Sequence, residues 1–574
     1  MRYSIIQKFL LLVLAYKKKT LQMLKSDKNI YLFLLAVFFV VLTIMLPFKD
    51  QLFSEDFAYA QSVRHFINTG DLKISERVVP TSITHIIWGT VVTKFLGLSL
   101  ANLHFSVVLL LPFLLFALYK LFSLIGCNKE KSFIFTIFFF SIPWILQLSY
   151  TFTTDIPFLI LEVFAILFYI QGFKENKTTS LLIGSIFASL AFLTRQLGIL
   201  LAFAAFVTVI LSSNSKNQKI KNALLSLGIP LLTLFLYLWW LSFPENKTIA
   251  QLSTYRELKE TYFYSFALNI LIENLARIIH TTLNLTSQAL GLLFPIILLL
   301  LLTNLKRVFN LANKNKRRFT VATIVAVIIY AIDIINFRKE YTVGFPFNIY
   351  QYENLLPVPW AHIWKYIVLI SLPILSCTIY LQYKNVIKLN NYQRFISLSF
   401  VFLAIPTVIH VAKWDIYIIP FLPLSMLWIA SSTKKFTLNL KLSLVVVLIL
   451  LLDSVQMTKL RYNESALIWE KAMKLVDSGI SPAEIDPSNN FGWYYWFYYE
   501  KLASDSIKSN DGNKDKSDYG FVIAKPDLPK YRIYTERMIR YSSLNTTNYK
   551  VQTIPLRSFL VNSKIYFMQL DERY

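Results

Sequence analysis

The sequence predicts an all-α polytopic membrane protein with a long first outer loop and a small C-terminal α/β domain outside the membrane. Hydrophobic residues make up 55% of the chain, charged residues only 16%, and the mean hydropathy is +0.50. This composition is typical of proteins that reside in lipid. The hydrophobic residues gather in long runs, and Lys and Arg cluster in the short polar gaps between them.

Apolar runs long enough to cross a bilayer recur along the chain. One helical crossing needs roughly 18 to 20 apolar residues, and a helix is required because lipid cannot satisfy open backbone groups. We therefore expect about thirteen crossings, which form a transmembrane domain over residues 30–453. They are Ile30 to Phe48 and residues 101–126, 132–150, 156–173, 179–194, 197–212, 223–242, 285–304, 319–336, 366–383, 395–411, 416–431 and 442–453.

Three further segments flank or interrupt this domain. Residues 1–29 hold a short apolar stretch followed by consecutive lysines, without a small-residue cleavage site, so we expect a cytosolic or interfacial segment and not a signal peptide. Residues 49–100 form a long loop, in which residues 82–98 are predicted to lie as a helix at the interface. Residues 454–574 are long enough for one small domain of roughly 100 residues.

The basic residues predict the orientation of the chain. Lys and Arg are enriched in cytoplasmic loops, and a single orientation places the basic gaps between the predicted crossings on the inside. An odd number of crossings then places residues 49–100 and 454–574 together on the outer face. We expect a multi-pass protein of the plasma (inner) membrane whose active site and C-terminus are extracytoplasmic.

Charge and cysteine content exclude several classes of function. The net charge of +25 comes largely from the polar gaps, where it indicates topology, so we expect no nucleic-acid partner. The two cysteines, Cys127 and Cys377, support neither a disulfide framework nor a thiolate metal site. The chain has no glycine-rich nucleotide loop.

Two adjacent carboxylates, Glu55 and Asp56, follow the first predicted crossing. If this stretch is helical, Asp56 and Tyr59 share one face. The alternative is an amphipathic interfacial helix that begins with a solvated acidic turn. The functional interpretation makes this loop a candidate site.

A second acidic position, Asp155, lies in the short outer turn between the third and fourth predicted crossings. Pro157 fits the first turn of the following helix, so Thr154 or Asp155 is expected at its N-cap. Capping by itself would explain Asp155. Its position is the argument for function, because the predicted orientation puts it on the same face as Asp56.

Arg195 interrupts an otherwise apolar stretch and is followed by Gln196. An arginine inside such a run is costly unless it is paired or lies at a water-filled edge, so it is a candidate functional residue. A phosphate would be a suitable partner, because a guanidinium binds one through bidentate hydrogen bonds. The alternative is an ion pair with Glu162 or Asp155.

Other polar residues near the predicted outer face are weaker candidates. Lys413, in the last outer turn, is one of them. The remaining weak candidates, for which an ordinary interfacial role is the alternative, are Asp333, His410 and Asp415.

At these residues the chain resembles the GT-C superfamily of polytopic glycosyltransferases, especially bacterial relatives of protein O-mannosyltransferases and of lipid A aminoarabinose transferases. The stretch S-E-D-F-A-Y-A-Q-S-V, with the later T-G-D-L-K, resembles their acidic first-loop motif. T-D-I-P-F resembles their second acidic motif, and L-T-R-Q-L-G the turn after their fifth span. The tail segment from Trp469 to Trp496 is similar to the outer domain of some members.

The resemblance implies a GT-C fold and inverting transfer from a polyprenyl-phosphate sugar, with a carboxylate as general base. Many members have Asp-Glu or Asp-Asp where this chain has Glu55 and Asp56, so either residue can be the base, and the spacing to Tyr59 favours Asp56. Arg195 would stabilise the phosphate, helped by Lys73, Arg64 or Lys413. These residues, with Asp155, Tyr59 and Gln196, form the expected site.

The implied partners are the lipid-linked donor, membrane lipids and an acceptor that is a lipid, a glycan or a protein. No cofactor is expected with certainty, and metal dependence stays open because isolated acids act either as bases or as ligands. Two alternatives are a glycan polymerase or ligase and a transporter or flippase. A transporter should keep its ionisable residues near the bilayer midplane, whereas these candidates lie at the outer rim.

Overall fold

The computed structural model describes most of the membrane domain and part of the C-terminal domain. Its described residues are 26–252 except 47, 54 and 249, residues 292–324 with gaps at 315, 318, 319, 322 and 323, residues 389–409, residues 418–487 except 435, the strands at 530–535, 549–557 and 562–570, and the single residues 278, 289, 493, 496 and 497. The structural statements below refer to these residues. The predicted crossings at 366–383 and most of 319–336 lie outside them, as does the segment 1–25.

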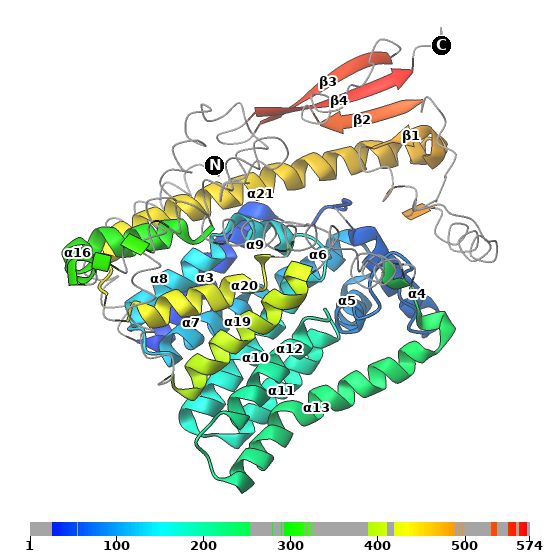
Figure 1. Ribbon diagram of the computed structural model, residues 1–574. Helices are drawn as coiled ribbons and strands as arrows, with labels where there is room; N and C mark the ends of the chain where they lie inside the picture. Colours follow the sequence, from blue (N-terminus) through cyan, green and yellow to red (C-terminus); the bar gives the residue numbers. More distant parts are fainter. Residues whose placement is uncertain are drawn as a thin grey trace.

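Helices dominate the described chain (Figure 1). In order they are α3 (Asp27–Met45), α4 (Asp56–Thr69), α5 (Ile83–Leu96), α6 (Leu100–Val108), α7 (Leu111–Leu124), α8 (Lys129–Phe140), α9 (Pro143–Ser149), α10 (Asp155–Glu175), α11 (Thr178–Phe192), α12 (Gly198–Ile210), α13 (Lys216–Ser242), α16 (Leu305–Lys314), α19 (Asn391–Ile409), α20 (Phe421–Ser432) and α21 (Leu440–Asp477). Polar side chains cap several starts. The caps are Ser99 for α6, Asn128 for α8 and Asn439 for α21.

Five of these helices are long and apolar enough to span a membrane, so the protein is an integral membrane protein. They are α3, α6 with α7, α10, α13 and α21. Among the shorter apolar helices, α11 and α12 pack beside α10 and α13, and α20 packs against α19. The described part of the chain thus confirms the helical membrane architecture, while the count of about thirteen crossings stays a prediction.

The segment predicted to cross at 132–150 is bent in the structure. The chain bends by 61° between α8 and α9, so it forms a broken span or a re-entrant loop. Pro143, at the start of α9, has no N–H to continue the hydrogen-bond ladder of α8. The Ser454 hydroxyl of α21 donates to the Ser141 carbonyl oxygen at the break, which satisfies an acceptor that the bend leaves open.

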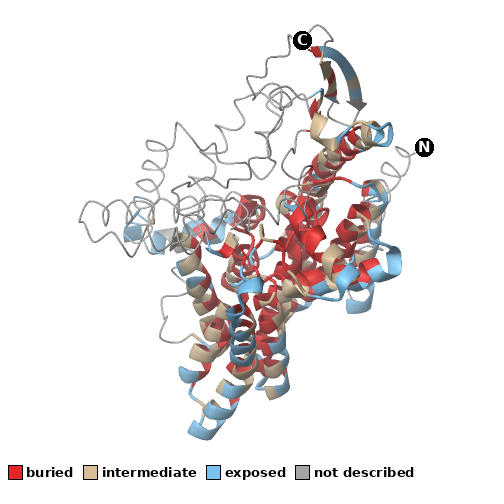
Figure 2. Ribbon diagram, turned by 90° about the vertical axis from the view of Figure 1, so that its right-hand side faces the viewer, coloured by how far each residue is buried: buried red, intermediate tan, exposed pale blue. Residues whose placement is uncertain are grey.

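Helix α10 lies at the centre of the bundle and contacts α7, α9, α11, α12 and α19. Small residues bring α10 and α11 close together, because a Cβ atom on Gly172 would lie 2.5 Å from Leu181 Cδ2. Buried residues concentrate where the helices meet, and exposed residues lie on the outward faces and free ends (Figure 2).

Basic side chains at the predicted inner ends hydrogen-bond to the last carbonyl oxygens of neighbouring helices. Such contacts satisfy acceptors that have no partner within their own helix, and they place a cation at the negative end of the helix dipole. The donor and acceptor residues are Lys131 with Thr433, Lys174 with Leu124, Lys219 with Ile210 and Arg394 with Leu211. The basic residues from which the cytosolic side was predicted therefore also stabilise the ends of helices.

A four-stranded sheet follows α21 in the order β1-β2-β4-β3 and lies beside that helix (Figure 1). Strand β1 (Ile485–Asp486) pairs parallel with β2 (Tyr531–Thr535), while β4 (Asn562–Leu570) pairs antiparallel with both β2 and β3 (Tyr549–Arg557). Helix α21 continues without a break past residue 453 and leads directly to the sheet. The small C-terminal sheet agrees with the α/β prediction.

The topology can be tested by thiol labelling at exposed positions, in a background with Cys127 and Cys377 replaced by serine. We expect Asp71→Cys and Lys550→Cys to react with a membrane-impermeant maleimide in intact cells. We expect Lys316→Cys, which is exposed among the basic residues after α16, to react only after permeabilisation. Labelling in the opposite pattern would invert the predicted orientation.

Candidate active site

At the start of α4, one carboxylate of the acidic pair Glu55 and Asp56 lies at the surface and the other lies in the interior. Glu55 is the N-cap residue and is exposed, whereas Asp56 is the first helical residue and has no exposed surface. The helical prediction for this stretch is confirmed, and Tyr59 lies in the same buried first turn as Asp56. The two neighbouring carboxylates therefore have different surroundings.

Asp56 pairs with His104, a residue that the sequence analysis missed. His104 Nε2 of α6 lies 2.7 Å from Asp56 Oδ2, and neither side chain is exposed. Burial raises the pKa of Asp56, while the hydrogen bond and charge of His104 oppose that shift. A histidine within an apolar crossing was the signal that could have indicated this partner.

Asp155 and Arg195 form an ion pair between the start of α10 and the turn that precedes α12. Arg195 Nη1 lies 2.5 Å from Asp155 Oδ1, and the Arg195 side chain is 20% exposed. Thr154 occupies the N-cap position of α10 without a side-chain capping bond. Of the two ion-pair alternatives for Arg195, the structure has the pair with Asp155, and Glu162 is buried two turns deeper in α10.

Glu55 lies close enough to this ion pair for both of its charges to act on the Glu55 carboxyl group, so three segments that are remote in sequence come near one another here. Burial raises the pKa of Glu55, and the charges of Asp155 and Asp56 raise it further, whereas Arg195 lowers it. Although Glu55 is exposed, enough protein surrounds its carboxyl for burial to be the largest effect. Arg77, also missed from the sequence, is a second cation that lowers the pKa of Glu55.

Tyr59 is buried near Glu55, Asp155 and Arg195. Burial and the charge of Glu55 raise the pKa of Tyr59, and its hydroxyl is hydrogen-bonded to Thr154. The Tyr59 ring meets the His85 ring edge-on at 5.3 Å, and His85 lies against Phe152 at 4.0 Å. Burial lowers the pKa of His85 to about 4, so this ring is neutral at physiological pH.

The remaining predicted residues do not all join the cluster. The Arg64 guanidinium stacks on the indole of Trp496 at 4.0 Å from the ring centroid, so it contacts the C-terminal domain. Lys73 is half-buried in the loop after α4, and Gln196 is exposed beside Arg195. Lys413 lies outside the described residues, as do the weaker candidates Asp333, His410 and Asp415.

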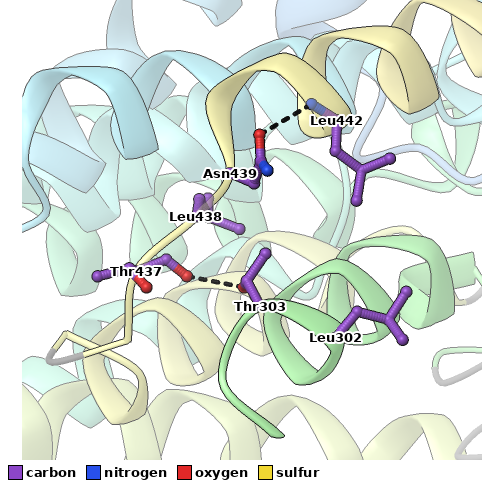
Figure 3. Close-up of a pocket in the computed structure, with 6 residues that line it drawn as sticks. All are labelled: Leu302, Thr303, Thr437, Leu438, Asn439 and Leu442. Atoms are coloured by element: carbon purple, nitrogen blue, oxygen red, sulfur yellow. Dashed lines mark hydrogen bonds between the residues drawn. The ribbon is translucent and has the colours of Figure 1, made fainter.

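The described residues contain no group of three His, Cys, Asp or Glu side chains that could hold a metal ion. A cavity of about 370 Å³ lies elsewhere, where the chain enters α21 (Figure 3). Its lining residues include no titratable group and are Leu302, Thr303, Thr437, Leu438, Asn439 and Leu442. The cluster of Glu55, Asp155 and Arg195 is therefore the better candidate for chemistry.

Comparison with known proteins gives one family match. Residues 83–242 match the family described as dolichyl-phosphate-mannose-protein mannosyltransferase. The matched segment contains Asp155, Arg195 and His104, but not Glu55 or Asp56. No curated protein matches the chain.

Two solved structures show a distant likeness. The crystal structure of ArnT from Cupriavidus metallidurans bound to undecaprenyl phosphate is 11% identical, with a TM-score of 0.38 over 94% of this chain and 98% of that one. The oligosaccharyltransferase AglB from Archaeoglobus fulgidus, in complex with an inhibitory peptide and a dolichol-phosphate, is 12% identical, with a TM-score of 0.39 over 85% and 61%. Likenesses at these scores assign no role to any residue of this chain.

The family match falls on the part of the chain that carries the second acidic motif and the arginine turn. These are two of the motifs on which the resemblance was based. The match over residues 83–242 confirms the predicted resemblance of this membrane protein to glycosyltransferases of the GT-C superfamily.

Proposed function

We propose that this protein is a membrane-embedded glycosyltransferase that transfers a sugar from a polyprenyl-phosphate donor to a lipid, glycan or protein acceptor. The observation that carries the proposal is the meeting of Glu55, Asp155 and Arg195 from three separate segments. The family description supports a lipid-phosphate donor. A donor with a long apolar tail also explains why the site belongs to a membrane domain.

Glu55 is the general base in this proposal, although the spacing in the sequence favoured Asp56. A general base must come within hydrogen-bond distance of the proton that it removes. Glu55 is exposed, whereas Asp56 has no exposed surface and is bound to His104. The raised pKa of Glu55 suits the role, because a base is most effective when its pKa approaches the working pH.

The transfer is a single displacement at the anomeric carbon. The acceptor oxygen or nitrogen forms a bond to this carbon as the bond from carbon to the phosphate oxygen breaks, and the configuration inverts. The acceptor proton passes to the Glu55 carboxylate, and the polyprenyl phosphate leaves as an anion. The reaction therefore needs a base on the acceptor side and a cation on the phosphate side.

Arg195 supplies that cation. Its guanidinium is partly exposed, lies next to Glu55 and is held in place by Asp155. A fixed cation stabilises the charge that develops on the leaving phosphate, and a planar guanidinium matches the geometry of phosphate oxygens. Arg77, which lies near Glu55, is the described cation best placed to assist. The site faces the extracytoplasmic side under the orientation that the basic residues predict.

The base assignment is tested by comparing Glu55→Gln with Asp56→Asn in purified protein supplied with a defined polyprenyl-phosphate sugar. We expect Glu55→Gln to lower kcat by roughly 10²–10⁴-fold with the fold intact, because a positioned base contributes about that much. We expect Asp56→Asn, unlike Glu55→Gln, to lower the thermal stability of the protein, because it changes the buried pair of Asp56 and His104. Full activity of Glu55→Gln would return the role to Asp56.

The pH dependence of transfer provides a second test. Glu55 acts as a base only when it is ionised, so activity should fall as the pH decreases through the pKa of Glu55. Because this pKa is raised, the fall should occur at a higher pH than for an ordinary glutamate. Because Asp155 raises the pKa of Glu55, Asp155→Asn should move the acid limb of the kcat/KM profile to lower pH. An unchanged or upward-shifted limb in a folded Asp155→Asn protein contradicts this arrangement.

Arg195 variants test the phosphate contact. We expect Arg195→Gln to lower kcat/KM for the donor by about 10- to 100-fold, because it removes hydrogen bonds to a charged phosphate. Arg195→Lys keeps the charge but not the planar fork, so its loss should be smaller. Acceptor binding should change little. Normal donor kinetics in both variants would show that Arg195 does not bind the phosphate and serves only in its ion pair with Asp155.

A further inference from the structure

The pair formed by Asp56 and His104 has no direct role in the proposed transfer, yet both groups are fully buried. Their 2.7 Å contact joins residues that are 48 positions apart, on α4 of the outer loop and on α6. Helix α6 is the outer part of the span Leu100–Leu124. The contact therefore connects the helix that begins next to Glu55 to a membrane-embedded element.

Hydrogen bonding indicates how this contact is made. Among the described residues, His104 Nδ1 has no hydrogen-bond partner. The contact at Nε2 fits an imidazole N–H that donates to Asp56 Oδ2. Asp56 Oδ1 makes no hydrogen bond in the described chain, although backbone groups of Phe53 and Phe152 lie near enough to lower the Asp56 pKa.

Glu55 at the N-cap of α4 makes no capping hydrogen bond, and within the first turn the Asp56 contact with His104 is joined by the hydrogen bond of the Tyr59 hydroxyl to Thr154. Helix α6, in contrast, is held firmly. The Ser99 hydroxyl accepts from the Asn102 N–H, and Asp50 Oδ1 accepts from the Ala101 N–H at 2.8 Å. His104 thus extends from a fixed helix to the first residue of α4, directly after Glu55.

We infer that His104 is a positioning residue: through its hydrogen bond to Asp56 it holds the first turn of α4 and thereby directs the Glu55 carboxylate toward the acceptor. This role rests on the proposed function, in which Glu55 is the base. A group displaced by about 1 Å from its productive position costs roughly 10²-fold in rate. The hydrogen bond between His104 and Asp56, at the first residue of α4, is therefore sufficient to affect catalysis.

Two amide substitutions separate positioning from general packing. In His104→Gln the side-chain amide reaches the place of Nε2, whereas in His104→Asn it reaches only the place of Nδ1. We expect His104→Gln to keep kcat within about threefold of wild type and His104→Asn to lower it about 10- to 100-fold, with KM for the donor unchanged in both. His65→Asn, which replaces a half-buried histidine on α4, is the matched control and should keep wild-type kcat.

A second readout does not depend on activity. In a protein without Cys127 and Cys377, the labelling rate of Glu55→Cys by a small maleimide reports how firmly the start of α4 is held. We expect His104→Asn to change this rate and His104→Gln to preserve it.

Equal kcat and equal labelling for the Gln and Asn variants would overturn the inference, as would loss of the folded protein in both. If wild-type protein transfers no sugar from polyprenyl-phosphate donors, the proposed function fails, and the labelling alone decides whether His104 holds this turn.

Discussion

The pairing of buried carboxylates with a histidine and an arginine at the predicted outer ends of the helices is the constraint on which this face of the protein depends. An ionised side chain away from water is costly, and removing one partner of a buried pair costs about 3–5 kcal/mol. Two such pairs stand side by side here. Asp155 with Arg195 joins α10 to the turn before α12, and Asp56 with His104 joins α4 to α6. These two contacts therefore hold the first residues of α4 and α10 against α6 and against the turn before α12.

This pairing also explains how two adjacent carboxylates come to have different roles. Asp56 turns inward because His104 offers a hydrogen bond there, and its neighbour Glu55 is left at the surface. Burial raises the pKa of Glu55, and the negative charges of Asp155 and Asp56 raise it further. The surroundings of Glu55, more than the adjacent Asp56, therefore give this carboxylate a raised pKa that suits a general base.

The two ends of the bundle use charge in opposite ways. At the predicted inner end, lysines and arginines donate to the terminal carbonyl oxygens of neighbouring helices, as Lys131 does to Thr433. At the predicted outer end, carboxylates and an arginine face one another, and Arg64 of α4 stacks on Trp496 of the C-terminal domain. The inner end thereby stabilises helix termini, whereas the outer end gathers the groups to which we assign roles in the proposed transfer.

The sequence by itself determined that the chain is helical and embedded in a membrane, because apolar runs of bilayer length and basic gaps are local properties. It also identified Glu55, Asp56, Asp155 and Arg195 as candidates, since charges are rare beside such runs. Only the tertiary structure decided their partners. His104 and Arg77 lie far from Glu55 and Asp56 in sequence, and the break at Pro143 appears when α8 and α9 pack against α21. The inward turn of Asp56 likewise depends on a neighbouring helix, and no local pattern specifies which helix that is.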